Sequence, residues 1–197
     1  MNSPEITSAA ATAIHDTQHW LERAVIGLNL CPFAKAVHVK GLIRYAVSEA
    51  TTPSELLSDL KNELNSLANM DVAGVSVSYD TTLLIAPYCL HDFLDFNDFL
   101  AKADKLIAKM KLEGTIQLAN FHPQYRFAGT EPDDITNFTN RAPYPTLHLL
   151  RESSIDQAVE AFPDAGAIFE VNMETMERLG LKGWDALQVG ATLNTTP

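Results

Sequence analysis

The sequence has few cysteines, few basic residues and no long hydrophobic run. We expect its only two cysteines, Cys31 and Cys89, to be reduced thiols rather than a structural disulfide, because nothing in the sequence indicates secretion. Fourteen Lys and Arg stand against 25 Asp and Glu, and the net charge of −11 disfavours nucleic acid and anionic membranes as partners. No segment approaches the roughly 20 apolar residues of a membrane span.

The motifs of several enzyme classes are also missing. The nine glycines are scattered, and neither GxGxxG nor GxxxxGK[ST] occurs, which weighs against a nucleotide enzyme. Neither GxSxG nor HExxH is present. The N-terminus lacks a basic region followed by an apolar run, so we expect no secretory signal and a cytoplasmic location. The sequence therefore leaves the reaction, the cofactor and the oligomeric state open.

The patterns that are present predict one folded domain. We expect a disordered tail at residues 1–7 and a single globular domain at 8–197. Hydrophobic periodicity predicts the order α-β-α-β-α-β, a long loop, then β-α-α, with strands at about 43–48, 81–86, 116–121 and 146–150. This order predicts an α/β fold (an α+β sandwich) with a roughly four-stranded mixed sheet and helices packed mainly on one face.

The clearest local signal marks the start of one helix. Thr52 is suited to be the N-cap, Pro53 suits the first helical position, and Glu55 completes a capping box. Leucines at helical spacing then form one apolar face of this helix: Leu56, Leu57, Leu60, Leu64 and Leu67.

Residues 120–152 are the segment best suited to hold a ligand. They contain three of the six arginines, two of the six histidines and four of the ten prolines, but none of the eight lysines. Planar, permanently charged guanidinium groups on a stiffened backbone suit a small anionic ligand. The 24 residues between Phe121 and Thr146 show no periodic pattern, and so long a loop inside a compact domain is usually functional or disordered. Its aromatics and prolines favour the functional reading.

Three segments resemble a family of bacterial proteins known as domain of unknown function 1415. The segments are Cys31-Pro32-Phe33-Ala34, then Phe121-His122-Pro123 with Tyr125, Arg126 and Phe127, and finally the run from Asn140 to Glu152. The resemblance extends from about Trp20 to Leu179. It implies a single-domain bacterial protein and supplies no activity or catalytic residues.

The residues themselves suggest one constellation. His122 ends the third strand and His148 lies within the fourth, so both imidazoles would face one cavity if these strands are neighbours, and either is a candidate acid/base. The expected ligand-binding residues are Tyr125, Arg126, Asn140, Arg141 and Arg151. The alternative is that Arg141 pairs with a nearby carboxylate to hold the loop, and that His148 is a satisfied interior histidine.

Cys31 is a further candidate for catalysis. A thiol at the N-cap of a short helix that begins near Pro32 would have a lowered pKa and would act as a nucleophile. The alternative is a small buried hydrophobic residue. Cys31, His122 and His148 would also make a transition-metal ligand set if the fold brought them together.

Two classes of function follow from these candidates. The favoured class is a small cytoplasmic enzyme that acts on an anionic small molecule, with histidine as acid/base and arginines as anion clamps. The alternative is a non-catalytic module that binds a small ligand, metal or cofactor.

Overall fold

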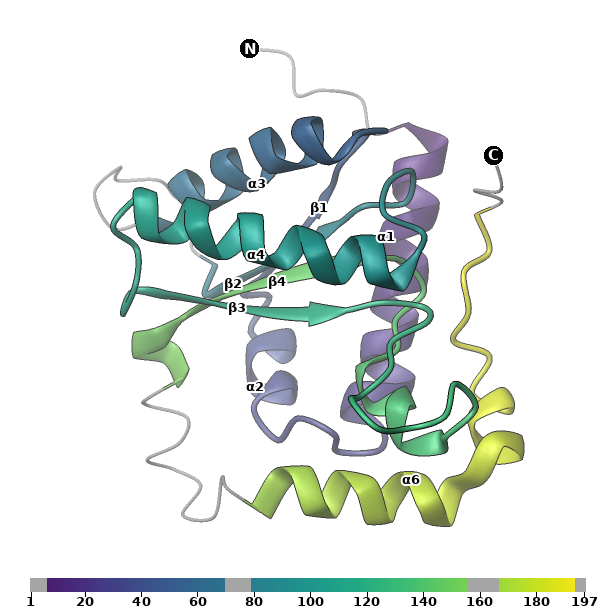
Figure 1. Ribbon diagram of the computed structural model, residues 1–197. Coiled ribbons are helices and arrows are strands. Elements are labelled where there is room, and N and C mark those ends of the chain that lie inside the picture. Colours follow the sequence, from purple (N-terminus) through teal and green to yellow (C-terminus); the bar gives the residue numbers. More distant parts are fainter. Residues whose placement is uncertain (1–6, 70–78, 156–166, 194–197) are drawn as a thin grey trace.

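A computed structural model describes residues 7–69, 79–155 and 167–193 (Figure 1). The tail expected at residues 1–7 therefore lies, except for its last residue, outside the described residues. The helices are α1 (Ser8–Trp20), the π-helix η1 (Leu21–Ile26), α2 (Ala34–Val39), α3 (Pro53–Ala68), α4 (Phe93–Lys109), the 3-10 helix η2 (Ile135–Asn140) and α6 (Ile168–Asp185). The strands are β1 (Ile43–Val47), β2 (Thr81–Ile85), β3 (Ile116–Phe121) and β4 (Thr146–Arg151).

The four strands form one mixed sheet in the order β1-β2-β4-β3. β1 and β2 are parallel, as expected for two strands joined by α3, whereas β4 is antiparallel to both of its neighbours. The predicted α/β class and four-stranded mixed sheet are confirmed. β3 and β4 are direct neighbours, as the candidate site required.

One face of the sheet is covered by α3 and α4. The predicted capping box is present: Thr52 accepts from the backbone N–H of Glu55, whose carboxylate accepts from the N–H of Thr52. The leucine face of α3 packs against α4 and the sheet in the largest hydrophobic core. Its fully buried members on α3 are Leu56, Leu60, Leu64 and Leu67.

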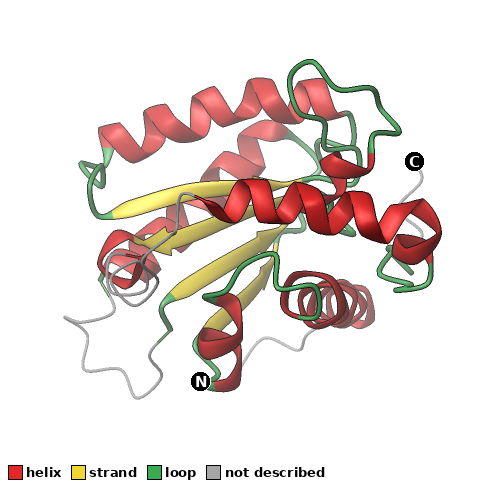
Figure 2. Ribbon diagram, turned by 90° about the horizontal axis from the view of Figure 1, so that it is seen from below, coloured by secondary structure: helices red, strands yellow, loops and turns green. Residues whose placement is uncertain are grey.

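The other face of the sheet is covered by α1, η1 and α2. Trp20, Leu21 and Val25 pack there with Tyr45 of β1 and Phe121 of β3. Figure 2 shows helices on both sides of the strands. The prediction that helices pack mainly on one face is therefore wrong. α1, η1 and the short α2 pack on the face opposite to α3 and α4.

α6 lies across one end of the molecule (Figure 1) and bends at Gly180, whose φ of 64° is a conformation that favours glycine. This helix packs against η2, which belongs to the long loop between β3 and β4. Among the described residues, none of the helices has both the length and the apolar content needed to cross a bilayer.

Candidate functional site

His122 follows β3 directly and is fully buried against α4. Its Nε2 lies 3.0 Å from the carbonyl oxygen of Leu90, and its Nδ1 accepts a 3.0 Å hydrogen bond from the N–H of Gln124. The ring packs on Phe93 and Phe96. A neutral imidazole protonated at Nε2 satisfies both backbone contacts. Burial lowers the pKa of His122 to about 4, so this neutral form persists at physiological pH.

His148 is also held in a neutral form. Its Nε2 lies 2.6 Å from Oγ1 of Thr81, and that hydroxyl donates to the carbonyl oxygen of Leu149 at 2.7 Å. Because the hydroxyl proton is committed to Leu149, Nε2 is the donor to Thr81. Burial lowers the pKa of His148 to about 4. Its Nδ1 has no hydrogen-bond partner in the described part of the chain.

The two histidines do not share a cavity. His148 is paired with Ala119 of β3, and directly paired residues project from the same face of a sheet. Phe121, two residues after Ala119, lies on that face and contacts the His148 ring. His122 comes one position later and contacts α4 on the opposite face. The expectation that both imidazoles line one pocket is therefore wrong.

The loop between β3 and β4 is organised by a buried asparagine. Asn137 accepts from the N–H of Phe127 at 2.9 Å and from Oγ1 of Thr130 at 2.7 Å, and it donates to the carbonyl oxygen of Glu131 at 2.8 Å. Asp134 caps η2 by accepting from the N–H of Thr136. Sequence reasoning missed Asn137. The signal in the sequence was Asp134-Ile135-Thr136, a capping pattern inside an apparently irregular loop.

Arg141 is the most unusual residue of this loop. Its Nε and Nη2 donate to the carbonyl oxygens of Tyr125 and Pro132, and its guanidinium lies 3.9 Å from the centroid of the Phe138 ring. The side chain is half-buried, and no carboxylate of the described residues forms an ion pair with it. Arg141 thus braces the loop as the alternative reading expected, but through carbonyls rather than through an acid.

Arg44, in contrast, has the usual carboxylate partner of a partly buried arginine. Arg44 forms a bidentate ion pair with Glu63, at 2.7 Å from Nε and 3.0 Å from Nη2. This pairing raises the pKa of Arg44, whereas burial without a counter-charge lowers the pKa of Arg141. The Arg141 charge is therefore fixed in position and not compensated by an acid of the described chain.

The other expected ligand-binding residues are placed differently. Arg126 is exposed on the same loop. Tyr125 packs between Phe93 and Phe127, and burial raises its pKa. Asn140 donates from its amide to the carbonyl oxygen of Asn120, although the distance is 3.4 Å.

Arg151 does not belong to the loop site. It is paired with Ile116, at the end of the β3–β4 ladder opposite the loop, and it donates to the carbonyl oxygen of Leu67 in α3 at 2.8 Å. The structure therefore brings Arg141 into contact with Tyr125, leaves Arg126 exposed on the same loop, and places Arg151 at the other end of the sheet.

Cys31 lies on the α1 side of the sheet, in the hydrophobic cluster around Trp20. The backbone N–H groups of Phe33 and Ala34 favour its thiolate, as an N-cap position predicts. Burial is the larger effect, however, and raises the pKa of the Cys31 thiol. The expectation of a lowered pKa is wrong. In the described part of the chain, no three His, Cys, Asp or Glu side chains are grouped to hold a metal ion.

A cavity of about 440 Å³ lies between α3 and the edge strand β1. Its wall carries Glu49, Glu55, Asp59 and Glu63, of which the last three follow one stripe of α3 at four-residue spacing. Three of these carboxylates already have partners: Glu55 closes the capping box, Asp59 accepts from Ser48 at 2.6 Å, and Glu63 pairs with an arginine. Its carboxylates are thus largely engaged within the protein. Sequence reasoning missed this cavity, although the four-residue spacing of the acids on α3 is visible in the sequence.

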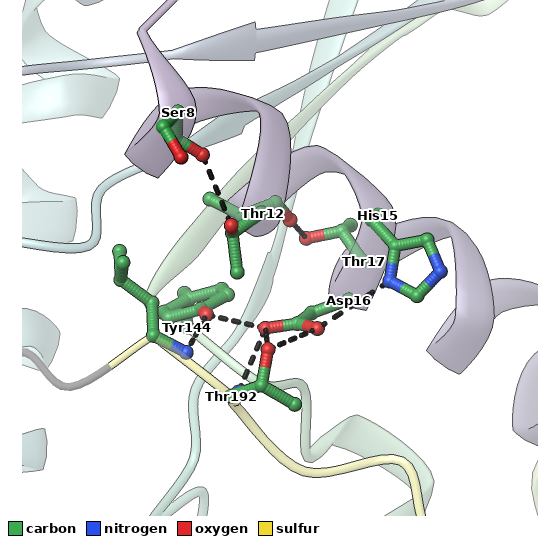
Figure 3. A network of polar contacts seen from close by, with 9 residues as sticks. Ser8, Thr12, His15, Asp16, Thr17, Tyr144 and Thr192 are labelled. Atoms are coloured by element: carbon green, nitrogen blue, oxygen red, sulfur yellow. Dashed lines mark hydrogen bonds and ion pairs between the residues drawn. The ribbon is translucent and has the colours of Figure 1, made fainter.

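A buried carboxylate, which sequence reasoning also missed, lies on α1 (Figure 3). Asp16 is 3% exposed and accepts a 2.6 Å hydrogen bond from the Tyr144 hydroxyl and a 2.8 Å bond from the N–H of Thr192. Burial alone would raise the pKa of Asp16, but these hydrogen bonds outweigh it and hold the pKa below its usual value. The three residues connect α1, the segment before β4 and the C-terminal segment.

The protein is thus an α/β protein with a mixed four-stranded sheet. A loop that carries arginines connects the antiparallel strands β3 and β4. Residues 12–186 match the family described as "Protein of unknown function (DUF1415)", and the chain belongs to this family. No curated protein and no solved structure shows significant similarity to the chain.

Proposed function

We propose that this protein binds a small anionic molecule at the loop between β3 and β4, with Arg141 as the fixed cation of the site and the exposed Arg126 as a second one. The observation that carries the proposal is the half-buried Arg141 guanidinium, which has no carboxylate partner among the described residues. Removing part of a charged group from water without a counter-charge is unfavourable, and a bound anion would offset that cost.

The surroundings of Arg141 strengthen this argument. The protein has 25 acidic residues, and three of them, Glu131, Asp133 and Asp134, lie in the same loop. None of the three pairs with Arg141. Asp134 instead caps η2, which directs its carboxylate to Thr136. None of the loop's acids therefore forms an ion pair with the guanidinium, which leaves its charge available to an external anion.

The geometry of Arg141 suits a carboxylate or phosphate. Two of its nitrogens are committed to backbone carbonyls and its plane is held against Phe138, so its orientation is fixed before a ligand arrives. Its Nη1 has no hydrogen-bond partner within the described ranges. A preoriented guanidinium binds planar or tetrahedral oxyanions without losing side-chain entropy.

Binding without catalysis is the form of the proposal that the geometry supports best. An acid/base role needs an imidazole that exchanges protons near neutral pH, but burial holds the pKa of both His122 and His148 at about 4. Both ring nitrogens of His122 are occupied by backbone groups. A cytoplasmic setting is part of the proposal and agrees with the two free cysteines, Cys31 and Cys89.

Calorimetric titration with inorganic phosphate and with succinate, at constant ionic strength, tests the proposal. The wild type should bind at least one of them, and Arg141→Lys should weaken binding about tenfold because the planar fork is lost. Arg23→Gln is the matched control, since it removes one exposed positive charge from η1 and should leave the affinity unchanged. Equal affinities of Arg141→Lys and the wild type would refute the proposal.

A further inference from the structure

The C-terminal segment runs along α1. After α6 ends at Asp185, residues 186–193 pass beside α1, where the yellow segment in Figure 1 lies next to the purple helix. We call residues 186–193 the strap. Val189 is its buried anchor and packs in the cluster of Trp20, Leu21 and Ala142.

Polar contacts fasten the far end of the strap (Figure 3). The backbone N–H of Thr192 donates to Oδ2 of Asp16 at 2.8 Å. The Thr192 hydroxyl also donates to this carboxylate, and its Oγ1 lies 2.8 Å from Oδ1 and 3.0 Å from Oδ2. The N–H of Leu193 donates to the Tyr144 hydroxyl at 3.2 Å, and that hydroxyl donates to Asp16 at 2.6 Å. His15 is the other titratable neighbour of the carboxylate, at 3.7 Å. We call this group of contacts the latch.

The last turn of α6, which leads directly into the strap, adjoins the proposed anion site. Trp184, in the last turn of α6, packs edge-on against Phe138, with ring centroids 5.2 Å apart. The Phe138 ring also contacts the Arg141 guanidinium. Trp184 therefore supports the ring on which the proposed anion-binding side chain rests.

The backbone after Arg141 is in contact with the strap as well. Ala142 packs in the same cluster as Val189, and the Tyr144 hydroxyl accepts a hydrogen bond from the N–H of Leu193. The last turn of α6 thus contacts Phe138, three residues before Arg141, and the strap that follows it contacts Ala142 and Tyr144, directly after Arg141.

We propose that the strap controls the anion site: when latched on Asp16 it holds Arg141 in its binding orientation, and its release lowers the affinity for the anion. This inference rests on the proposed function. Coupling between two sites is reciprocal, so an anion at Arg141 must tighten the latch by the same factor by which the latch tightens anion binding. The two ends of this coupling are about 50 residues apart in sequence and joined by direct packing.

Two measurements test the coupling. Amide hydrogen exchange, resolved by NMR, follows the N–H groups of Thr192 and Leu193, which are both donors in the latch. Inorganic phosphate should slow their exchange in the wild type. Thr192→Val, which removes the hydroxyl but keeps the N–H, should weaken phosphate binding at least about fivefold, the lower end of typical allosteric couplings.

Control variants separate the possible failures. Thr12→Val removes a hydroxyl on α1 that bonds only to its own helix, at Ser8, and should change neither readout. Denaturant unfolding confirms that each variant is folded, and Asp16→Asn is a second way to weaken the latch. If the wild type binds phosphate but Thr192→Val and Asp16→Asn bind it equally well, and exchange at Thr192 and Leu193 is unaffected, the coupling is refuted while the anion site stands. If the wild type binds neither phosphate nor succinate, both proposals fail.

Discussion

The side chains of His122 and His148 lie on opposite faces of the sheet, although they belong to neighbouring antiparallel strands. The register pairs Ala119 with His148, so Phe121 shares the His148 face and the next residue, His122, turns to α4. His122 makes hydrogen bonds with backbone groups of Leu90 and Gln124, and His148 makes one with the Thr81 hydroxyl. The two histidines are therefore better explained as neutral structural groups than as one acid/base pair.

Burial of neutral His122 predicts a loss of stability in mild acid. Its pKa is about 4 in the folded chain and about 6.5 when unfolded, so the unfolded state binds more protons between these values and the free energy of unfolding falls as pH drops from 6.5 to 4. The loss approaches about 3 kcal/mol across this window. Urea unfolding at several pH values measures it. His122→Gln should be less stable at pH 7 but show a shallower pH dependence, and an unchanged slope would contradict the assignment.

The core of α3 and the loop should respond differently to substitution. Leu60 is fully buried, and Leu60→Ala should lower the free energy of unfolding by about 2–5 kcal/mol. Arg141→Lys gives up hydrogen bonds to two carbonyls and should cost only about 1–2 kcal/mol. Chemical denaturation of the two variants compares these values. If Arg141→Lys destabilises the protein as much as Leu60→Ala, Arg141 serves the fold and not a ligand.

Cys31 should react slowly with alkylating reagents. Burial raises the pKa of its thiol, so little thiolate is present at pH 6 to 7. The measurement is the pH profile of iodoacetamide labelling in a Cys89→Ala background, with labelling expected to rise only above about pH 8.5. Rapid labelling of the folded protein at pH 6 would restore Cys31 as a candidate nucleophile.

Local signals in the sequence predicted local structure well. The Thr52–Glu55 capping box, the leucine stripe of α3 and the four strand segments depend on residues near one another in the chain, and all are present. The pairing of β3 with β4, on which the candidate site was conditional, is the arrangement that consecutive strands often adopt.

Contacts between distant residues were not predictable from the sequence. The Asp16–Thr192 contact spans 176 positions, and no pattern in either segment marks the partner. The partners of Arg141 are backbone carbonyls, which every residue possesses, so composition favoured a carboxylate instead. The helical coverage of both faces depends on where the chain crosses the sheet, which hydrophobic periodicity does not specify.

The Arg141 side chain itself provides the most direct test of the central claim. Its Nε–H, which donates to Tyr125, can be followed in a ¹H–¹⁵N NMR spectrum and assigned from its disappearance in Arg141→Lys. Added inorganic phosphate at constant ionic strength should shift this signal saturably, whereas the Nε–H of Arg44, paired with Glu63, should not move. An Arg141 signal that stays in place, or that moves only together with the signals of all other arginines, would contradict an anion site at this loop.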